Sequence, residues 1–195
     1  MLFTIIKDTV LQHLIVNLPD NLRYHDQAHT ADVIRAARQY GTMAGLDEAS
    51  MDILLTASLL HETGIIEGYQ GHEQASVRYA RKLLPAYGYS VEQIDNIGQL
   101  ILETTIPQAP TTLLSKILCD ADLDYLGRPD YFAISHKLRL EWMFLNNYPE
   151  SLNIWYAEQL VFLQNHKYFT AWATETRSKG LAHNISLIKA LLAIS

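Results

Sequence analysis

The sequence predicts an all-α protein, a single-domain helical bundle of the whole chain, residues 1–195. Three observations support this fold class. Apolar residues recur every three or four positions along most of the chain, as they do in helices that bury one face. No segment alternates apolar and polar residues in the manner of a half-buried strand. The prolines lie mostly between periodic segments, and neither a repeat nor a low-complexity linker divides the chain.

Each predicted helix corresponds to one run of apolar periodicity. Gly88 is placed to end one of these helices, and Ser90 with Gln93 fits a capping box at the start of the next. In chain order, the predicted helices include residues 33–44, 53–60, 77–87, 94–102, 114–125, 129–147, 150–167 and 180–194.

Composition and charge narrow the classes of partner. The net charge is −6 and no basic run occurs, which argues against a protein that binds a nucleic-acid backbone. A nucleotide is not excluded, because it needs only a local group of positive side chains. The single cysteine, Cys119, rules out an intramolecular disulfide framework and a cysteine-rich zinc site, and it fits a reducing compartment.

The apolar N-terminal segment carries Lys7, Asp8 and His13. It lacks the basic start and the small-residue cleavage site of a secretion signal. No uncharged apolar run reaches the length of a membrane span. We therefore expect a soluble, cytoplasmic protein with no membrane partner.

The helix 53–60, ILLTASLL, carries no charge and ends at His61-Glu62. A helix that is apolar on nearly every side is normally buried. Burial of an unpaired carboxylate at its end costs several kcal/mol. A bound cation would remove that cost, and imidazole with carboxylate is a common pair of metal ligands. In isolation, the pair could equally be a helix end with a histidine near the negative end of the dipole.

His25 and His29 stand four residues apart and share one face if this stretch is helical. His29 is also four residues before Val33, so it is predicted to point along the core face. Taken alone, this segment could equally be a polar first turn of a helix.

The third candidate segment is CDADLDYLG, residues 119–127, which contains three acids. Asp122 is four residues after Leu118 and three before Tyr125, so it falls on the buried stripe. Asp120 and Asp124 fall off that stripe and are expected to be solvated. An acid on an apolar face needs a partner, which makes Asp122 a candidate ligand.

Together these segments predict a site for a divalent transition metal, with Mn, Fe, Co, Ni and Zn all compatible. The predicted ligands are His29, His61, Glu62 and Asp122. His72 opens another helix and shares a face with Ser76 and Ala80. It follows His61 across a short glycine-containing loop, which can bring the two helix ends together. The alternative for His72 is a simple capping residue.

The ordered set of histidines and acids resembles the HD-domain metal-dependent phosphohydrolase superfamily over about residues 20–130. The resemblance implies that His25 donates a proton to the leaving group and that His29 binds metal. The resemblance also implies that Asp122, which follows Ala121, is a metal ligand, independently of its place on the buried stripe. The phrase from His72 to Ser76 is similar to one whose histidine lies beside the substrate phosphate or a second metal.

The resemblance implies hydrolysis of a phosphate ester, on a nucleotide or another small phosphorylated metabolite, with His25 and His72 as catalytic residues. One departure matters: the family has His-Asp where this chain has His61-Glu62. The glutamate oxygens reach about 1.5 Å further. Three interpretations stay open: an enzyme, a catalytically weak or inactive metal-binding regulatory module, and an oxidative di-iron member of the superfamily.

Overall fold

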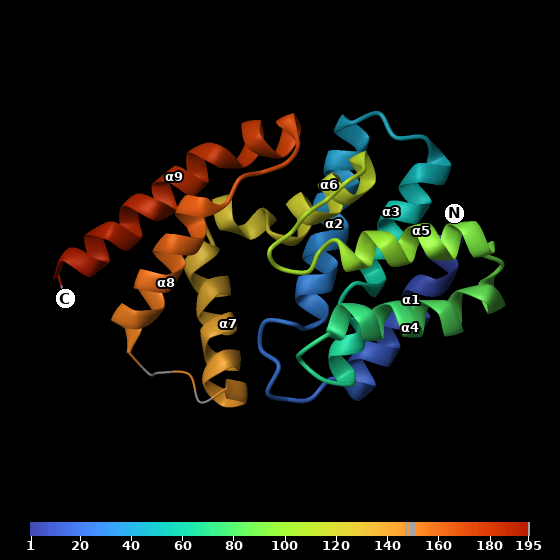
Figure 1. Cartoon of the computed structure of the whole chain (residues 1–195), viewed down its shortest axis with the longest axis horizontal. Helices are drawn as coiled ribbons and strands as arrows, with labels where there is room; N and C mark the ends of the chain where they lie inside the picture. The colour runs from blue at the N-terminus through green and yellow to red at the C-terminus, as the bar shows by residue number, and fades with distance from the viewer. Residues whose placement is uncertain (147, 149–150, 195) are drawn as a thin grey trace. The chain divides into compact units, whose positions relative to one another are not determined.

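The computed structural model describes residues 1–146, 148 and 151–194 (Figure 1). Among these residues, regular structure consists of α-helices and short 3-10 helices, and no strand is formed. The prediction of an all-α fold is confirmed. No helix in the described part of the chain has the length and apolarity to cross a bilayer.

The contacts divide the chain into two compact units. The first unit comprises Met1–Asp20 and His25–Asp122, and the second comprises Asn21–Tyr24 and the chain from Leu123 onward. That residues 1–195 form one HD-type domain stays a prediction.

The first unit is organised around one helix, α3, against which α1, α2, α5 and α6 pack. Its elements are α1 (Leu2–Asn17), α2 (Gln27–Met43), α3 (Glu48–Leu60), the 3-10 helix η1 (Thr63–Ile66), α4 (His72–Leu83), the 3-10 helix η2 (Leu84–Tyr87), α5 (Val91–Leu102) and α6 (Leu113–Asp122). Every residue of α3 from Met51 to Leu60 is buried. The absence of a polar face in this helix is therefore explained by neighbours on several sides.

The polar groups of α3 are satisfied inside the unit. Asp52 accepts a hydrogen bond from the backbone N–H of Phe3, at 3.0 Å, which holds the start of α1 against the central helix. Thr56 and Tyr89 share a hydrogen bond of 2.7 Å between their hydroxyl groups. These bonds offset the cost of burying polar side chains in an apolar helix.

The second unit contains the 3-10 helix η3 (Asp124–Gly127), α7 (Tyr131–Asn146), α8 (Leu152–Asn165) and α9 (Ala171–Ile194). Its core includes Tyr131, Trp155 and Ile188, which are fully buried. Asp124 is only 3% exposed, so the expectation of a solvated acid is wrong. Its carboxylate accepts two hydrogen bonds from the Arg177 guanidinium, at 2.7 and 3.0 Å.

Several helix boundaries differ from the periodic runs. Three helices, α2, α3 and α4, begin five or six residues before the predicted positions 33, 53 and 77. The boundary between residues 87 and 94 agrees better with the sequence. The capping box of Ser90 and Gln93 opens α5, and Gly88, with φ of 85°, ends η2. By contrast, α9 begins nine residues before the predicted 180, and α1 was not predicted at all. The predicted helix 114–125 ends at Asp122 and gives way to η3. The predicted end of helix 129–147 and the predicted start of helix 150–167 lie outside the described residues.

Candidate metal centre

The first histidine of the site is positioned by the start of α2. The Asp26 carboxylate accepts hydrogen bonds from the backbone N–H groups of Ala28 and His29, at 2.8 and 2.9 Å. This N-cap fixes the first turn, and His29 is buried within it. His25 therefore precedes the helix, so the stretch from His25 to His29 is not helical throughout and the two residues do not share a helical face.

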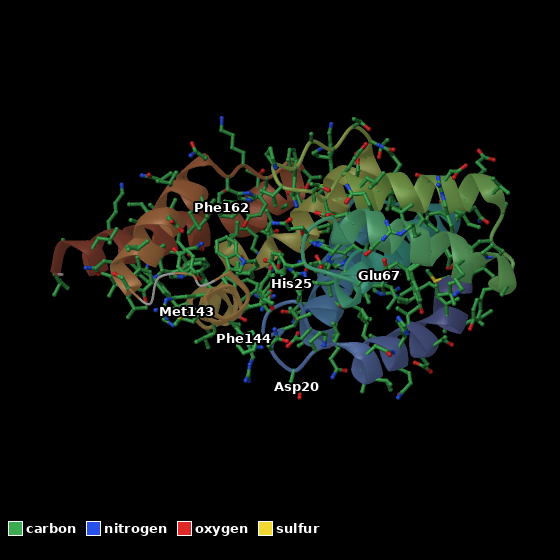
Figure 2. The ribbon with its side chains drawn as sticks, turned by 60° about the horizontal axis from the view of Figure 1, so that its bottom comes forward. Asp20, His25, Glu67, Met143, Phe144 and Phe162 are labelled. Atoms are coloured by element: carbon green, nitrogen blue, oxygen red, sulfur yellow. The ribbon has the colours of Figure 1, made fainter. Side chains whose placement is uncertain are left out.

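His25 nevertheless lies close to the site. It belongs to the segment that connects α1 to α2 and is labelled in Figure 2. Its ring centroid lies 6.1 Å from that of His29, 5.8 Å from that of His72 and 5.4 Å from that of Tyr69. The side chain is partly exposed, whereas His29 is buried. His25 thus adjoins the ligand cluster from outside the helix.

The second histidine, His61, lies at the C-terminal end of α3 and is fully buried. Its Nδ1 donates a hydrogen bond of 2.8 Å to the backbone carbonyl of Ser58. A carbonyl can only accept, so the proton resides on Nδ1 and Nε2 offers a lone pair in the neutral ring. The imidazole is thus oriented as a metal ligand usually is.

A close approach of two backbones holds this end of α3. The Ser76 hydroxyl in α4 donates to the His61 carbonyl and accepts from the Gly64 N–H, each at 2.8 Å. A Cβ at Gly64 would lie 2.1 Å from the His72 carbonyl oxygen, so only glycine fits there. The turn therefore fixes His61 and the first residues of α4 with respect to each other.

The second carboxylate, Asp122, is the last residue of α6. Its Oδ1 lies 3.3 Å from Nε2 of His29 and 3.6 Å from Nε2 of His61. Its Oδ2 accepts a hydrogen bond from the Gln108 amide at 3.1 Å. One oxygen is thus held by an outside donor, and the other faces the two imidazoles.

The four predicted ligands converge on one point. His29, His61, Glu62 and Asp122 each offer one atom, and these atoms all lie within 4.8 Å of one another. The two Nε2 atoms are 3.4 Å apart, and Oε1 of Glu62 is 3.6 Å from Nε2 of His61. Donors held about 2.0–2.2 Å from a transition metal stand about 3–3.5 Å apart. The donor set and its spacing therefore fit a divalent ion.

Glu62 reaches past this cluster to His72. Its Oε2 is buried and has no aligned hydrogen-bond donor among the described residues. The nearest positive group is Nε2 of His72, at 3.3 Å. The His72 Nδ1 donates to the carbonyl of Tyr69 at 2.8 Å, which turns Nε2 towards the carboxylate. His72 opens α4 and is only partly buried, as a group that meets a ligand would be.

The imidazoles and carboxylates of the site shift each other's pKa values. Burial alone would raise the pKa of Asp122, but hydrogen bonds and charge from His29 and His61 hold it below its usual range. Burial likewise opposes the charge on Glu62, and the neighbouring His25, His72 and His61 lower its pKa. Burial opposes the charge on His72, but the Glu62 carboxylate raises its pKa to about 9. Both carboxylates are therefore ionised at neutral pH, as ligands of a cation must be.

Comparison with known proteins identifies the family. The family model for the HD domain matches residues 27–124, which is just over half of the chain. This chain belongs to the HD domain family. The matched residues include all four candidate ligands and His72, while His25 lies just before the match.

Two solved structures share the fold. A predicted HD superfamily hydrolase from an uncultured Thermotogales bacterium is 21% identical, with a TM-score of 0.65 over 95% of this chain and 91% of that one. Bacillus subtilis YpgQ, solved in complex with ADP, is 18% identical, with a TM-score of 0.69 over 100% of this chain and 97% of that one. No curated protein matches the sequence.

Within this HD domain, the structure corrects the expectation for Asp120. The residue is fully buried, although the helix-face argument expected a solvated acid. The prediction treated α6 as a helix with one covered face. In the structure it packs against α2, α3 and α5, so more than one face is enclosed.

Several residues that shape the HD site were not predicted from sequence. Gln108 and Tyr69 lie in loops, where no periodicity points to them. Glu103 accepts hydrogen bonds from the backbone and hydroxyl of Thr111, at 2.8 and 2.7 Å, and so anchors the segment that leads into α6. Ser76 was named only as part of a phrase, and its double hydrogen bond was not foreseen. Gly64, two residues after Glu62, was the one available signal of a close backbone approach.

Proposed function

We propose that this chain is a metal-dependent phosphohydrolase that cleaves a phosphate ester of a small molecule, a nucleotide in the first instance. The observation that carries the proposal is the convergence of four ligand atoms from α2, the end of α3 and α6. Membership of the HD family, a family of metal-dependent phosphohydrolases, agrees with it.

In this proposal His29, His61, Glu62 and Asp122 hold the ion. A divalent metal there would lower the pKa of a water molecule towards neutrality and neutralise negative charge on the phosphate oxygens. The mixed set of imidazoles and carboxylates suits Mn, Fe, Co, Ni and Zn, and it does not select among them.

The chain supplies the proton and the positive charge around the phosphate. His25 is the proposed general acid for the leaving oxygen, because its ring adjoins the cluster without belonging to it. His72 is proposed to hold a phosphate oxygen. Its pKa of about 9 keeps the ring protonated at neutral pH, and its side chain is partly accessible.

A nucleotide is proposed because a protein of the same fold, Bacillus subtilis YpgQ, was solved with ADP. The net charge of −6 makes a small nucleotide a better partner than a nucleic acid. We also propose a cytoplasmic location, which rests on the single cysteine.

The test is turnover of nucleotides and phosphomonoesters by protein stripped with chelator and then reloaded with Mn²⁺, Co²⁺, Ni²⁺ or Zn²⁺. We expect about one metal per chain by elemental analysis and activity that is lost and restored with the metal. Protein that binds none of these ions in calorimetry would refute the site. Protein that binds metal yet hydrolyses nothing on the panel would favour the alternative.

That alternative is a metal-binding regulatory module without turnover, and Glu62 in place of the family aspartate is the observation that favours it. An oxidative di-iron site needs more ligands. Among the described residues, the one cluster of metal-ligating side chains is the four-residue set given above.

A further inference from the structure

The cleft between α1 and α2 has the size and the charge of a second ligand site. Its volume is about 650 Å³, within the roughly 300–1,000 Å³ typical of small-molecule sites. None of the candidate metal ligands lines it. The cleft is therefore separate from the centre described above, although both use α2.

The lining of the cleft divides into a positive part and an apolar part. Lys7, Arg35 and Arg38 supply three positive side chains, and none of the described residues that line the cleft is acidic. This is an unusual concentration for a chain with 21 acidic and 15 basic residues. Phe3 and Ile34 also line the cleft and are buried, with 3% and 9% of their surface exposed.

The positive side chains are available to a ligand to different degrees. Arg35 donates to Asp32 at 2.8 Å, so part of its charge is already compensated. Arg38 places its guanidinium 5.8 Å from the centre of the Phe3 ring, and within the described residues neither Arg38 nor Lys7 forms an ion pair. A planar guanidinium over a ring, beside a flexible ammonium, suits a phosphate attached to an organic group.

We propose that this cleft binds a small organic phosphate of nucleotide size. Lys7 and Arg38 contact the phosphate, and the organic group lies against Phe3 and Ile34. The proposal is independent of the hydrolytic function, because it needs no metal and none of the metal-site residues.

The test is calorimetric titration of metal-free protein with ATP in the presence of EDTA. We expect saturable binding at one site. Charge reversal in Lys7→Glu and in Arg38→Glu should each weaken that binding about tenfold or more, the scale for a lost charge-assisted hydrogen bond. If a charge-reversed variant fails to fold, Lys7→Gln or Arg38→Gln takes its place. These variants add no repulsion and should also weaken ATP binding. Lys82→Glu makes the same charge change on an exposed residue of α4 and should leave binding within about twofold.

Two further arms separate this site from the metal centre and test the organic part. His72→Ala should not affect ATP binding in EDTA, and tripolyphosphate should bind more weakly than ATP. The proposal is overturned if ATP does not bind, if the Lys7 and Arg38 variants bind it as wild type does, or if His72→Ala removes the binding. Equal affinity for tripolyphosphate and ATP would contradict the contact with Phe3 and Ile34.

Discussion

Nε2 of His72 lies 3.3 Å from Oε2 of Glu62, while Oε1 of the same carboxylate joins the cluster of candidate ligands. The extra methylene of glutamate thus links two functional elements, the end of α3 and the start of α4. An aspartate on the same backbone would reach about 1.5 Å less far. We propose that the contact with His72 compensates for glutamate in place of the family's aspartate.

Glu62→Asp tests whether that compensation supports activity. We expect turnover to fall about 10- to 100-fold at matched metal loading, because the shorter side chain withdraws from the site and leaves His72 without its partner. Glu67→Asp is the control, since Glu67, labelled in Figure 2, is exposed. Its carboxylate pairs with Arg78, away from the candidate ligands. A wild-type protein that is inactive beside an active Glu62→Asp would instead support the regulatory module.

Asp122→Ala should remove bound metal, whereas Asp120→Ala should retain it. Asp122 faces the imidazoles of His29 and His61, and Asp120 is buried but does not belong to the ligand cluster. Both variants are expected to melt at a lower temperature, since both carboxylates are enclosed. The distinguishing measurements are metal content and the rise in melting temperature on adding Mn²⁺, which should vanish only for Asp122→Ala. The reverse result would refute the assignment.

His25→Ala should keep the metal and slow turnover about 100- to 10,000-fold, the usual scale for a lost general acid. The loss should be smaller for substrates with good leaving groups, because those leave without a proton. His183→Ala, at an exposed position of α9, serves as the control. Equal losses for every leaving group would exclude His25 from this role.

Glu103→Gln should make the protein less sensitive to acid. Burial alone would raise the pKa of Glu103, but hydrogen bonds from Gln99, Ser115 and Thr111 outweigh it and lower the pKa to about 2. A lowered pKa means that the folded state prefers the ionised form. Its stabilisation is therefore complete above the ordinary value near 4.5 and is lost as the pH falls towards 2.

The measurement is the free energy of unfolding from urea titrations between pH 7 and pH 2. Above pH 5 we expect Glu103→Gln to be less stable than the wild-type protein by about 1–2 kcal/mol. This figure is the contribution of charge-assisted hydrogen bonds, reduced because solvent partly screens the carboxylate. The difference should shrink towards pH 2. Parallel curves for the two proteins would show that the carboxylate does not contribute through its ionisation.

The sequence predicted those parts of the site that depend on local periodicity. The uncharged run in α3 indicated burial, and its position before His61-Glu62 indicated a cation there. Asp122 was found because its spacing to Leu118 and Tyr125 placed it on a buried stripe. The burial of α3 is confirmed, because a helix repeats every 3.6 residues and neighbours three and four apart share a face. Leu118 lies one turn before Asp122 in α6, whereas Tyr125 lies in η3, beyond the end of that helix.

What only the tertiary structure decided is which helix ends meet and which faces are enclosed on all sides. His29, His61 and Asp122 come together because α2 and α6 both pack on α3, a relationship between segments up to 93 positions apart in the sequence. The burial of Asp120 and the bond from Gln108 follow from the same packing. Asp124 is buried in the second unit, where Arg177 from α9 binds its carboxylate. Periodicity gives the direction of a side chain from its own helix axis, whereas the neighbour it meets is chosen by the packing of the remaining helices and loops.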